Sequence, residues 1–265
     1  MKRSGLGLAA LVLLATPAFA GDLPTSNYPA SPPPSGSPLY SPDSIVTADF
    51  TAAIGWTGVG KDLDNDSATG QLAGRVNIPL WAGWNEEIEV TGVDQFNNDL
   101  FSAGAFGHTY YKNQSYAAGF VLGGGASDPF GDGTNEFFTT GIEGIVFLPN
   151  ASVLGSANYN WSNGPDFWVL ALEGRYYFEP NTKLTGRVAW NSIGDDEWLL
   201  YGALEHRWQG TPFSTFVSAN WRPAPGDTDT WGIMIGARYF FDQRNGTLQS
   251  HDFEIPFSQG IDTVF

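Results

Sequence analysis

The sequence contains no cysteine among its 265 residues, so no disulfide and no lipid-modified cysteine are expected. Long apolar runs are absent as well. The run from Leu6 to Ala15 is too short for a membrane-spanning helix, which needs about 20 apolar residues. Because Lys2 and Arg3 precede this run and Ala18-Phe19-Ala20 follows it, residues 1–20 are predicted to be a secretory signal peptide.

Charged residues are also scarce, at 15% of the chain, against about 25% in soluble globular domains. The formal net charge is -16, which repels nucleic acid, so no nucleic-acid partner is expected. Glycine and aromatic residues are abundant instead, with 33 Gly, 10 Trp, 10 Tyr and 19 Phe. This composition favours a β-sheet whose outer face meets lipid, with aromatic side chains at the membrane interfaces.

Composition also divides the chain into segments. Residues 21–44 are rich in Pro and Ser and are predicted to form an extended periplasmic linker. Residues 45–241 are predicted to form the membrane domain. Residues 242–265 are predicted to be a C-terminal periplasmic tail without a membrane role, and Pro256 argues against a further central strand.

Residues 45–241 alternate in polarity with a period of two. In 230–241, for example, Trp231, Ile233 and Ile235 share one face, and Gly232 and Met234 share the other. The apolar faces tend to begin and end with an aromatic residue, as two interfacial girdles require. The pattern predicts an all-β fold: a transmembrane antiparallel up-and-down β-barrel of about twelve strands, with ten or fourteen as alternatives.

The connections between the predicted strands are of two kinds. Long acidic connections alternate with short turns such as 149–150, which is the asymmetry of an outer-membrane barrel. An even strand count places both ends of the barrel on the periplasmic side. Asp94 falls on the lipid face, so either it lies near the rim or its strand contains a bulge. The predicted strands are 45–57, 69–81, 86–96, 101–111, 115–124, 136–148, 151–161, 167–178, 182–191, 197–208, 213–222 and 229–241.

The same alternation predicts a charged barrel interior. Two interpretations remain open: a charged constriction that sorts solutes, or a set of salt bridges that fills a closed lumen. The predicted pore-lining residues are Asp49, Arg75, Glu89, Glu143, Glu173, Arg175, Arg187, Glu205, Arg207 and Arg238.

One connection has the start of a calcium-loop pattern. Asp62, Asp64 and Asp66 place carboxylates at alternate positions, as hard oxygen ligands of Ca²⁺ are spaced. Position 6 of the loop is Ser67 rather than Gly, and position 12 is Ala73 rather than Glu. We therefore expect weak Ca²⁺ or Mg²⁺ binding at most, or a solvated loop, and no other cofactor.

A hydrolase needs a nucleophile or activated water beside a base, most often histidine. The chain has three histidines: His108 and His206 near the turns of the predicted barrel, with His206 facing lipid, and His251 in the tail. None lies near the acidic loops, so no enzymatic activity is expected.

Several segments resemble a group of alphaproteobacterial outer-membrane barrels that are porin-like or uncharacterised. They are Gly107-His-Thr-Tyr-Tyr-Lys-Asn-Gln-Ser-Tyr-Ala-Ala-Gly119, Gly141-Ile-Glu-Gly144, Gly236-Ala-Arg-Tyr-Phe-Phe241 and Gly246-Thr-Leu-Gln-Ser-His-Asp252. The resemblance implies a fold and a location but no catalytic residues. Gly236-x-x-Tyr239-x-Phe241 is also similar to the insertion signal of barrel proteins, which implies the barrel-assembly machinery as a partner.

These observations favour an outer-membrane channel for small polar solutes or ions, whose acidic mouth concentrates cations. The alternative is a non-conducting barrel that stabilises the envelope through divalent-cation bridges from its acidic loops to lipopolysaccharide. A barrel hydrolase is the third and least favoured hypothesis. The expected partners are outer-membrane lipid and lipopolysaccharide.

Overall fold

The computed structural model describes residues 46–59, 67–96, 100–128, 134–192, 197–223, 229–241 and 246–258. All of them belong to one compact unit, Pro38–Phe265. The predicted signal peptide and linker lie outside the described residues, as do most of the predicted acidic loops. No helix in the described ranges is long and apolar enough to cross a membrane.

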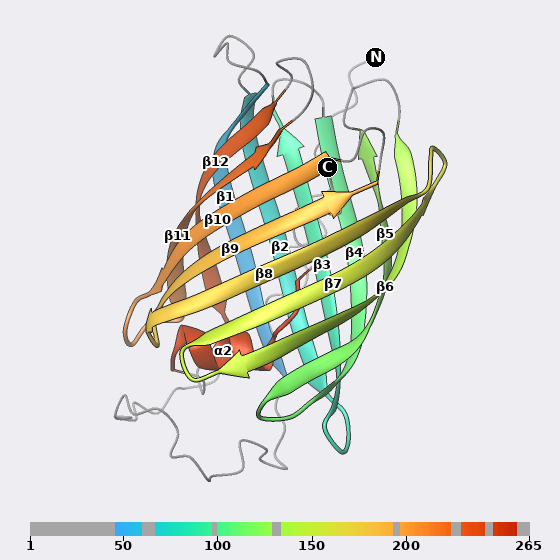
Figure 1. The fold of residues 1–265 in the computed structure, drawn as a ribbon. Helices are drawn as coiled ribbons and strands as arrows, with labels where there is room; N and C mark the ends of the chain where they lie inside the picture. The colour runs from blue at the N-terminus through green and yellow to red at the C-terminus, as the bar shows by residue number, and fades with distance from the viewer. Residues whose placement is uncertain are drawn as a thin grey trace. The chain divides into compact units, whose positions relative to one another are not determined.

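Twelve antiparallel strands form a closed barrel, in which each strand pairs with its neighbours in sequence and β1 pairs with β12 (Figure 1). This confirms the predicted fold class and strand count. The largest boundary difference is in β5, which continues to Asp128 rather than ending at residue 124. The strands are β1 Thr47–Val59, β2 Ser67–Pro79, β3 Trp84–Gln95, β4 Leu100–Lys112, β5 Tyr116–Asp128, β6 Asn135–Leu148, β7 Ala151–Ser162, β8 Phe167–Glu179, β9 Thr182–Asn191, β10 Glu197–Arg207, β11 Phe213–Arg222 and β12 Thr230–Phe240.

The period-two alternation places the apolar face of each strand on the outside. Across the closing pair, Ile54 of β1 lies opposite Ile235 of β12, and these side chains are 63% and 60% exposed. Their neighbours Ala53 and Met234 point inward and are buried. Exposing such a continuous apolar belt to water would be unfavourable, so the barrel presents a surface suited to hydrocarbon.

Short turns join the strands at one end of the barrel, here called the turn end; the opposite end is called the loop end. The turn between β2 and β3 has Ala82 and Gly83 at φ values of 52° and 88°, in the left-handed region. Asp94 is exposed beside the last residue of β3, at the rim of the loop end, where a charge on the outer face costs little.

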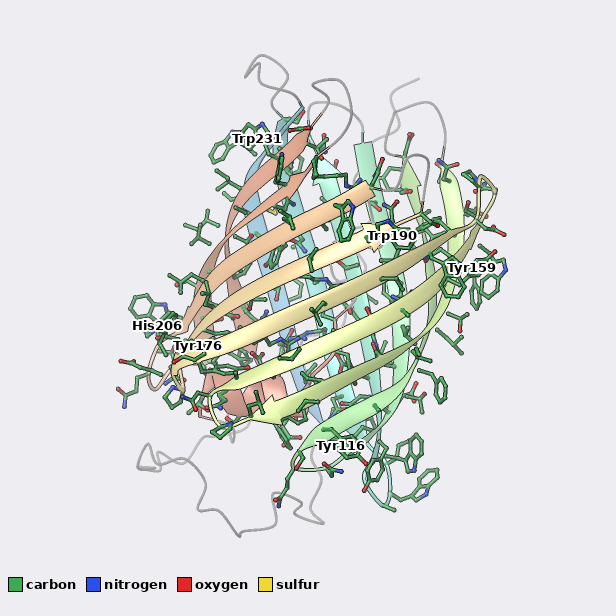
Figure 2. All side chains as sticks on the ribbon, viewed as in Figure 1. Tyr116, Tyr159, Tyr176, Trp190, His206 and Trp231 are labelled. Carbon is green, nitrogen blue, oxygen red and sulfur yellow. The ribbon has the colours of Figure 1, made fainter. Side chains whose placement is uncertain are left out.

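Tryptophan gathers at the two ends of the barrel and is absent from the middle of the described strands. Figure 2 shows Trp190 and Trp231 towards the loop end, and Tyr116 and Tyr176 towards the turn end. Such girdles mark the two interfaces of a membrane-spanning barrel. Trp81, Trp84 and Trp208 belong to the turn end, and Trp56, Trp161, Trp168, Trp190, Trp198, Trp221 and Trp231 belong to the loop end.

Phenylalanine rings cover glycines on neighbouring strands. A Cβ atom on Gly236 of β12 would overlap the ring of Phe216 of β11, and one on Gly123 of β5 would overlap Phe106 of β4. The missing side chain gives each ring its space on the lumen wall. Aromatic residues that cover glycine in this way help to fix strand register.

The C-terminal residues differ from the expectation of a periplasmic tail. Residues 246–258, here called the C-terminal segment, contain helix α2 (Leu248–Glu254), which lies within the turn end of the barrel (Figure 1). Leu248, Ile255 and Phe257 are each 0% exposed. The segment is therefore part of the packed barrel interior, because the barrel buries these apolar side chains completely. Thr247 caps α2, its hydroxyl accepting a hydrogen bond from Ser250 N.

Candidate functional site in the barrel lumen

The ten predicted pore-lining residues all face the barrel interior. Nine of them are buried, and the side chain of Arg238 is 17% exposed. Strand register explains this placement, because each lies on the face opposite the lipid-facing residues. That these side chains line a conducting path stays a prediction.

The carboxylates Glu87, Glu89 and Glu143 form what we call the acidic wall, on β3 and β6. His108 of β4 lies between them, with its Nδ1 2.8 Å from Glu143 Oε1 and its Nε2 3.7 Å from Glu89 Oε2. Glu87 is 0% exposed, and neither of its carboxylate oxygens has a hydrogen-bond partner among the described residues. Three carboxyl groups are thus concentrated on one side of the lumen, around one histidine.

Six cations lie on another part of the barrel wall, on strands β2, β8, β9, β10 and β12. We call them the basic wall: Arg75, Arg175, Lys183, Arg187, Arg207 and Arg238.

Three barrel carboxylates pair with the basic wall. The closest contacts are Arg75 Nη2 to Asp49 Oδ2 at 2.5 Å, and Arg175 Nε to Glu173 Oε1 at 2.6 Å. Glu205 accepts from Lys183 at 3.1 Å. Cations therefore outnumber the carboxylates of the wall itself, and this side of the lumen carries a net positive charge.

The C-terminal segment contributes the oxygen atoms that compensate this charge. Lys183 Nζ lies 2.5 Å from Asp252 Oδ2, and Lys112 Nζ of β4 lies 3.0 Å from Glu254 Oε2. Three arginines donate to backbone carbonyl oxygens of the segment. These are Arg75 to Phe257 at 3.1 Å, Arg187 to Ser258 at 3.4 Å and Arg207 to Thr247 at 3.3 Å.

Two titratable groups of the segment are shaped by this environment. Burial lowers the pKa of His251, whose Nε2 lies 2.9 Å from Asp49 Oδ2. Burial alone would raise the pKa of Asp252, but the cations Lys183, Arg175 and Arg238 around it hold that pKa well below its usual range. Neutral His251 and ionised Asp252 are the forms that fit the docked segment.

The aromatic ring of Phe257 completes the docking. It lies edge-on to Tyr110 with centroids 4.9 Å apart, and it stacks on His108 at 6.2 Å. Tyr110 and Phe257 share a buried apolar cluster with Ala117, Ile145 and Leu154. The segment thus joins the two walls, with polar contacts to the basic wall and an aromatic contact beside the acidic wall.

A cavity of about 150 Å³ remains in the lumen above the segment. Its lining includes five members of the basic wall, and Asp252 and Ser258 from the segment. Towards the loop end the buried side chains of the described lumen are uncharged, among them Thr69, Ser102, Thr139 and Asn160. Both amide atoms of Asn160 have no hydrogen-bond partner among the described residues, so they retain capacity to bind water or a polar solute.

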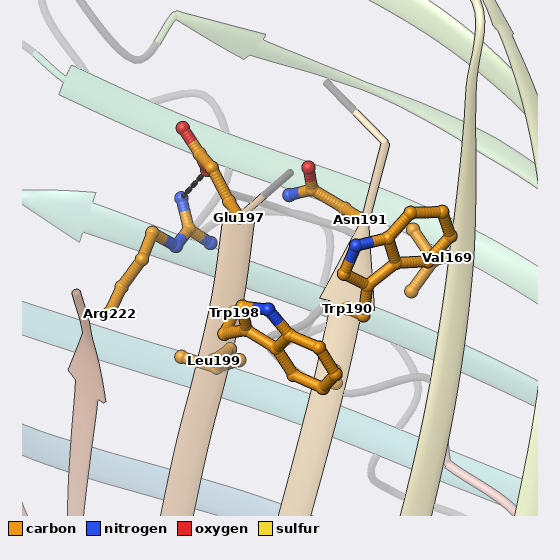
Figure 3. A pocket seen from close by; sticks show the side chains of 8 residues that line it. Val169, Trp190, Asn191, Glu197, Trp198, Leu199 and Arg222 are labelled. Atoms are coloured by element: carbon orange, nitrogen blue, oxygen red, sulfur yellow. Dashed lines mark ion pairs between the residues drawn. The ribbon is translucent and has the colours of Figure 1, made fainter. Parts of the chain in front are cut away.

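A second, very small hollow of about 10 Å³ lies at the loop end of β8 to β11 (Figure 3). Arg222 Nη1 and Glu197 Oε2 form an ion pair there at 3.5 Å, beside Trp190 and Trp198. The hollow has room for about one water molecule, so it is too small for a solute.

Sequence reasoning missed several lumen residues: Glu87, His108, Lys112, Lys183, His251 and Asp252. Glu87 and Glu89 lie on the inward face of β3, and Lys183 and Arg187 lie on the inward face of β9. The period-two pattern was therefore a usable signal for both Glu87 and Lys183. Lys112 lies one residue beyond the predicted strand 101–111 but is the last residue of β4. For His251 and Asp252 no pattern in the sequence indicated the lumen.

The remaining predicted sites have different outcomes. Asp62, Asp64 and Asp66 lie outside the described residues, and within the described ranges no group of three His, Asp or Glu is arranged to hold a metal ion. His206 lies on the outer surface, as expected, with its Nδ1 2.8 Å from Thr182 Oγ1. His108 and His251 both contact carboxylates in the lumen.

No protein-family model and no curated protein sequence matches this chain. Solved structures with a similar fold include the KdgM porin in complex with disordered oligogalacturonate, with a TM-score of 0.55 and 10% identity over 72% of this chain and 98% of that chain. The NanC porin has a TM-score of 0.55 and 8% identity over the same shares. The alphaproteobacterial part of the resemblance stays a prediction. The chain therefore has the closed barrel fold that is also found in the KdgM and NanC porins.

Proposed function

We propose that the chain is an outer-membrane channel for small polar solutes or ions. One observation carries the proposal: an apolar barrel exterior encloses a polar lumen whose charged walls surround a cavity of about 150 Å³. A barrel interior that only had to be filled would be stabilised more simply by apolar packing, because buried ion pairs are costly to desolvate. The porin structures of similar fold support the same function.

The proposed location includes lipid and lipopolysaccharide as neighbours and the barrel-assembly machinery as a partner during insertion. Both ends of the barrel domain would face the periplasm, with the turn end on that side. Solutes would enter from the loop end, pass the uncharged Thr and Asn side chains, and then meet the two charged walls. We propose no hydrolase activity.

The test is conductance of the purified full-length protein in planar lipid bilayers, combined with swelling of proteoliposomes in small sugars and amino acids. We expect discrete current steps and swelling that falls as solute size increases. Liposomes without protein are the control. Absence of steps at every salt concentration, with the barrel folded by circular dichroism, would rule out the channel.

One observation favours the alternative of a non-conducting barrel that stabilises the envelope. The C-terminal segment occupies the turn end of the lumen with three apolar side chains that are 0% exposed, Leu248, Ile255 and Phe257. In that case the conductance test gives no steps, and removal of divalent cations lowers the thermal stability of the protein in lipopolysaccharide-containing membranes. The acidic loops required for such bridges lie outside the described residues.

A further inference from the structure

The buried cations of the barrel converge on oxygen atoms of the C-terminal segment. Five of the six members of the basic wall contact it: Lys183 and Arg238 through Asp252, and Arg75, Arg187 and Arg207 through carbonyl oxygens. Lys112 adds a sixth contact, from the opposite side of the lumen, to Glu254. The segment thus occupies the basic wall as an oxygen-rich, anionic ligand would.

We propose that the basic wall is a binding site for small carboxylate-bearing anions, and that the C-terminal segment holds this site as the chain's own competing ligand. The inference rests on the proposed channel function and names the solute class that its inner site takes. In the docked state the segment closes the turn end of the lumen. In the released state an anion replaces it on the same cations.

Charge explains why the replacement must be an anion. Without the segment, six cations face four carboxyl groups, Asp49, Glu173 and Glu205 with Glu89 opposite Arg75. The wall then loses the Asp252 carboxylate and several carbonyl acceptors at once. Uncompensated charge in such an interior is strongly unfavourable. Arginine also binds carboxylates in a geometry that neutral solutes do not match.

The cavity gives a solute access to these cations while the segment is still docked. Arg75, Arg187 and Lys183 line it directly, and Asp252 and Ser258 of the segment lie on the same cavity. An anion that enters from the loop end therefore reaches cations that also contact the segment. Competition for Lys183 and Arg187 then weakens the contacts that hold the segment.

The barrel does not depend on the segment for closure. The sheet closes through the register of β1 with β12, which runs from Asp49–Phe240 to Val59–Thr230. The segment is fixed to the turn end by Gln249, whose backbone N donates to Pro180 O at 2.9 Å and whose side chain donates to Pro149 O at 2.7 Å. Because no residue of the segment takes part in the β1–β12 pairing, the segment can leave the lumen while the twelve strands stay paired.

A reversible tether tests the inference in the full chain. The background has no cysteine, so Pro180→Cys with Gln249→Cys introduces one pair at backbones that are already hydrogen-bonded. Oxidation should lock the segment in place, and reduction should release it. Gln249→Cys alone is the matched control. In planar bilayers, sodium citrate should raise the open-to-closed ratio of the reduced pair and the control but not of the oxidised pair, and sorbitol should have no effect.

A second variant removes the charges of the segment. Asp252→Asn with Glu254→Gln should raise the open-to-closed ratio without citrate by about tenfold or more, because charge-assisted hydrogen bonds to both carboxylates are lost. Glu179→Gln, an exposed carboxylate at the same end of the barrel, is the control and should leave the ratio unchanged.

The outcomes separate this inference from the proposed function. Equal conductance of the oxidised and reduced pairs, or equal effects of citrate and sorbitol, overturns the inference and leaves the channel in place. No conductance from any of these proteins, with all of them folded, overturns the channel itself. If the double charge variant does not fold, the comparison of the oxidised and reduced cysteine pair still tests the inference.

Discussion

At the scale of single residues, the lumen depends on charges that share partners. Asp49 is the clearest case, because it accepts from Arg75 Nη2 at 2.5 Å and from Arg75 Nε at 3.3 Å, and it contacts His251 at 2.9 Å. It joins β1, β2 and the C-terminal segment at one point. Removing this charge leaves Arg75 buried without its counter-ion.

We expect Asp49→Asn to lower the free energy of unfolding by about 3 kcal/mol or more, the usual cost of breaking one side of a buried ion pair. Urea unfolding of the protein in lipid vesicles, followed by tryptophan fluorescence, measures the change. Asp94→Asn is the control, because Asp94 is exposed at the rim of β3 and its loss should be nearly neutral. Equal effects of the two substitutions would contradict the role assigned to Asp49.

At the scale of elements, strand pairing and ring packing act together. Phe216 of β11 fills the space beside Gly236 of β12, where a Cβ would also lie 2.6 Å from Ala52 O of β1. The glycine therefore lets a ring lie flat on the lumen wall next to the closing strand pair.

Gly236→Ala should destabilise the barrel by about 1–3 kcal/mol, because the added methyl group overpacks this contact. Gly174→Ala in β8 is the matched control, since a Cβ there would meet nothing within 4 Å. Both variants are compared by urea unfolding. A larger effect at Gly174 would show that the ring contact does not limit the packing of the closing strands.

Docking of α2 should weaken as the solution becomes acidic. The pKa of docked His251 is lowered by burial, so the released segment binds more protons below about pH 6.5. The charged groups that face His251 are Asp49, Arg75 and Asp252. Asp252 also weakens docking as the pH falls further. Its pKa in the docked segment is lowered, so its stabilisation of docking is lost as the carboxylate becomes protonated.

The measurement is the open-to-closed ratio in planar bilayers between about pH 7.5 and about pH 5, the window in which histidine changes charge. The ratio should rise as the pH falls. His251→Asn keeps a neutral hydrogen-bonding side chain and should remove the change near pH 6. An unchanged pH response in that variant would assign the transition to another group.

At the scale of the whole molecule, the two tryptophan girdles define how the barrel sits in a bilayer. Trp81, Trp84 and Trp208 belong to one interface, and the other seven tryptophans to the opposite one. Between them lie aliphatic residues such as Ile54 and Ile235. This arrangement predicts that no tryptophan lies at the bilayer centre.

Quenching by brominated lipids tests this placement. Lipids with bromine close to the headgroup should quench tryptophan fluorescence more strongly than lipids with bromine near the end of the acyl chain. An Ile235→Trp variant, with one indole added in the middle of the belt, supplies the opposite pattern as a control. Stronger quenching of the unchanged protein by the deep bromine would be inconsistent with two interfacial girdles.

The sequence predicted the fold well because the barrel is built from local repeats. Alternation such as Ile233, Met234 and Ile235 recurs in strand after strand, and each side chain direction follows from parity alone. The lumen contacts were less accessible to prediction. Which carboxylate meets Arg75 depends on register between strands, and the docking of His251 on Asp49 joins residues 202 positions apart.

The C-terminal segment gave no usable pattern. Helix α2 has only seven residues, and its buried positions Leu248, His251 and Asp252 mix apolar and charged side chains. Such a helix is too short to show an apolar stripe, so nothing in the sequence contradicted the prediction of a periplasmic tail. Its buried His251 and Asp252 contact barrel side chains, Asp49 and Lys183, that only the fold brings together.

The position of this segment after β12 has a consequence for the order of assembly. Its docking site includes Asp49 and Arg75 from the first two strands and Arg238 from the last. The site is therefore complete only after β1 has paired with β12 and closed the barrel. We therefore expect docking to follow the slow long-range pairing of β1 with β12. A folding intermediate that stalls between these two events would have a closed barrel whose turn end does not yet hold the segment.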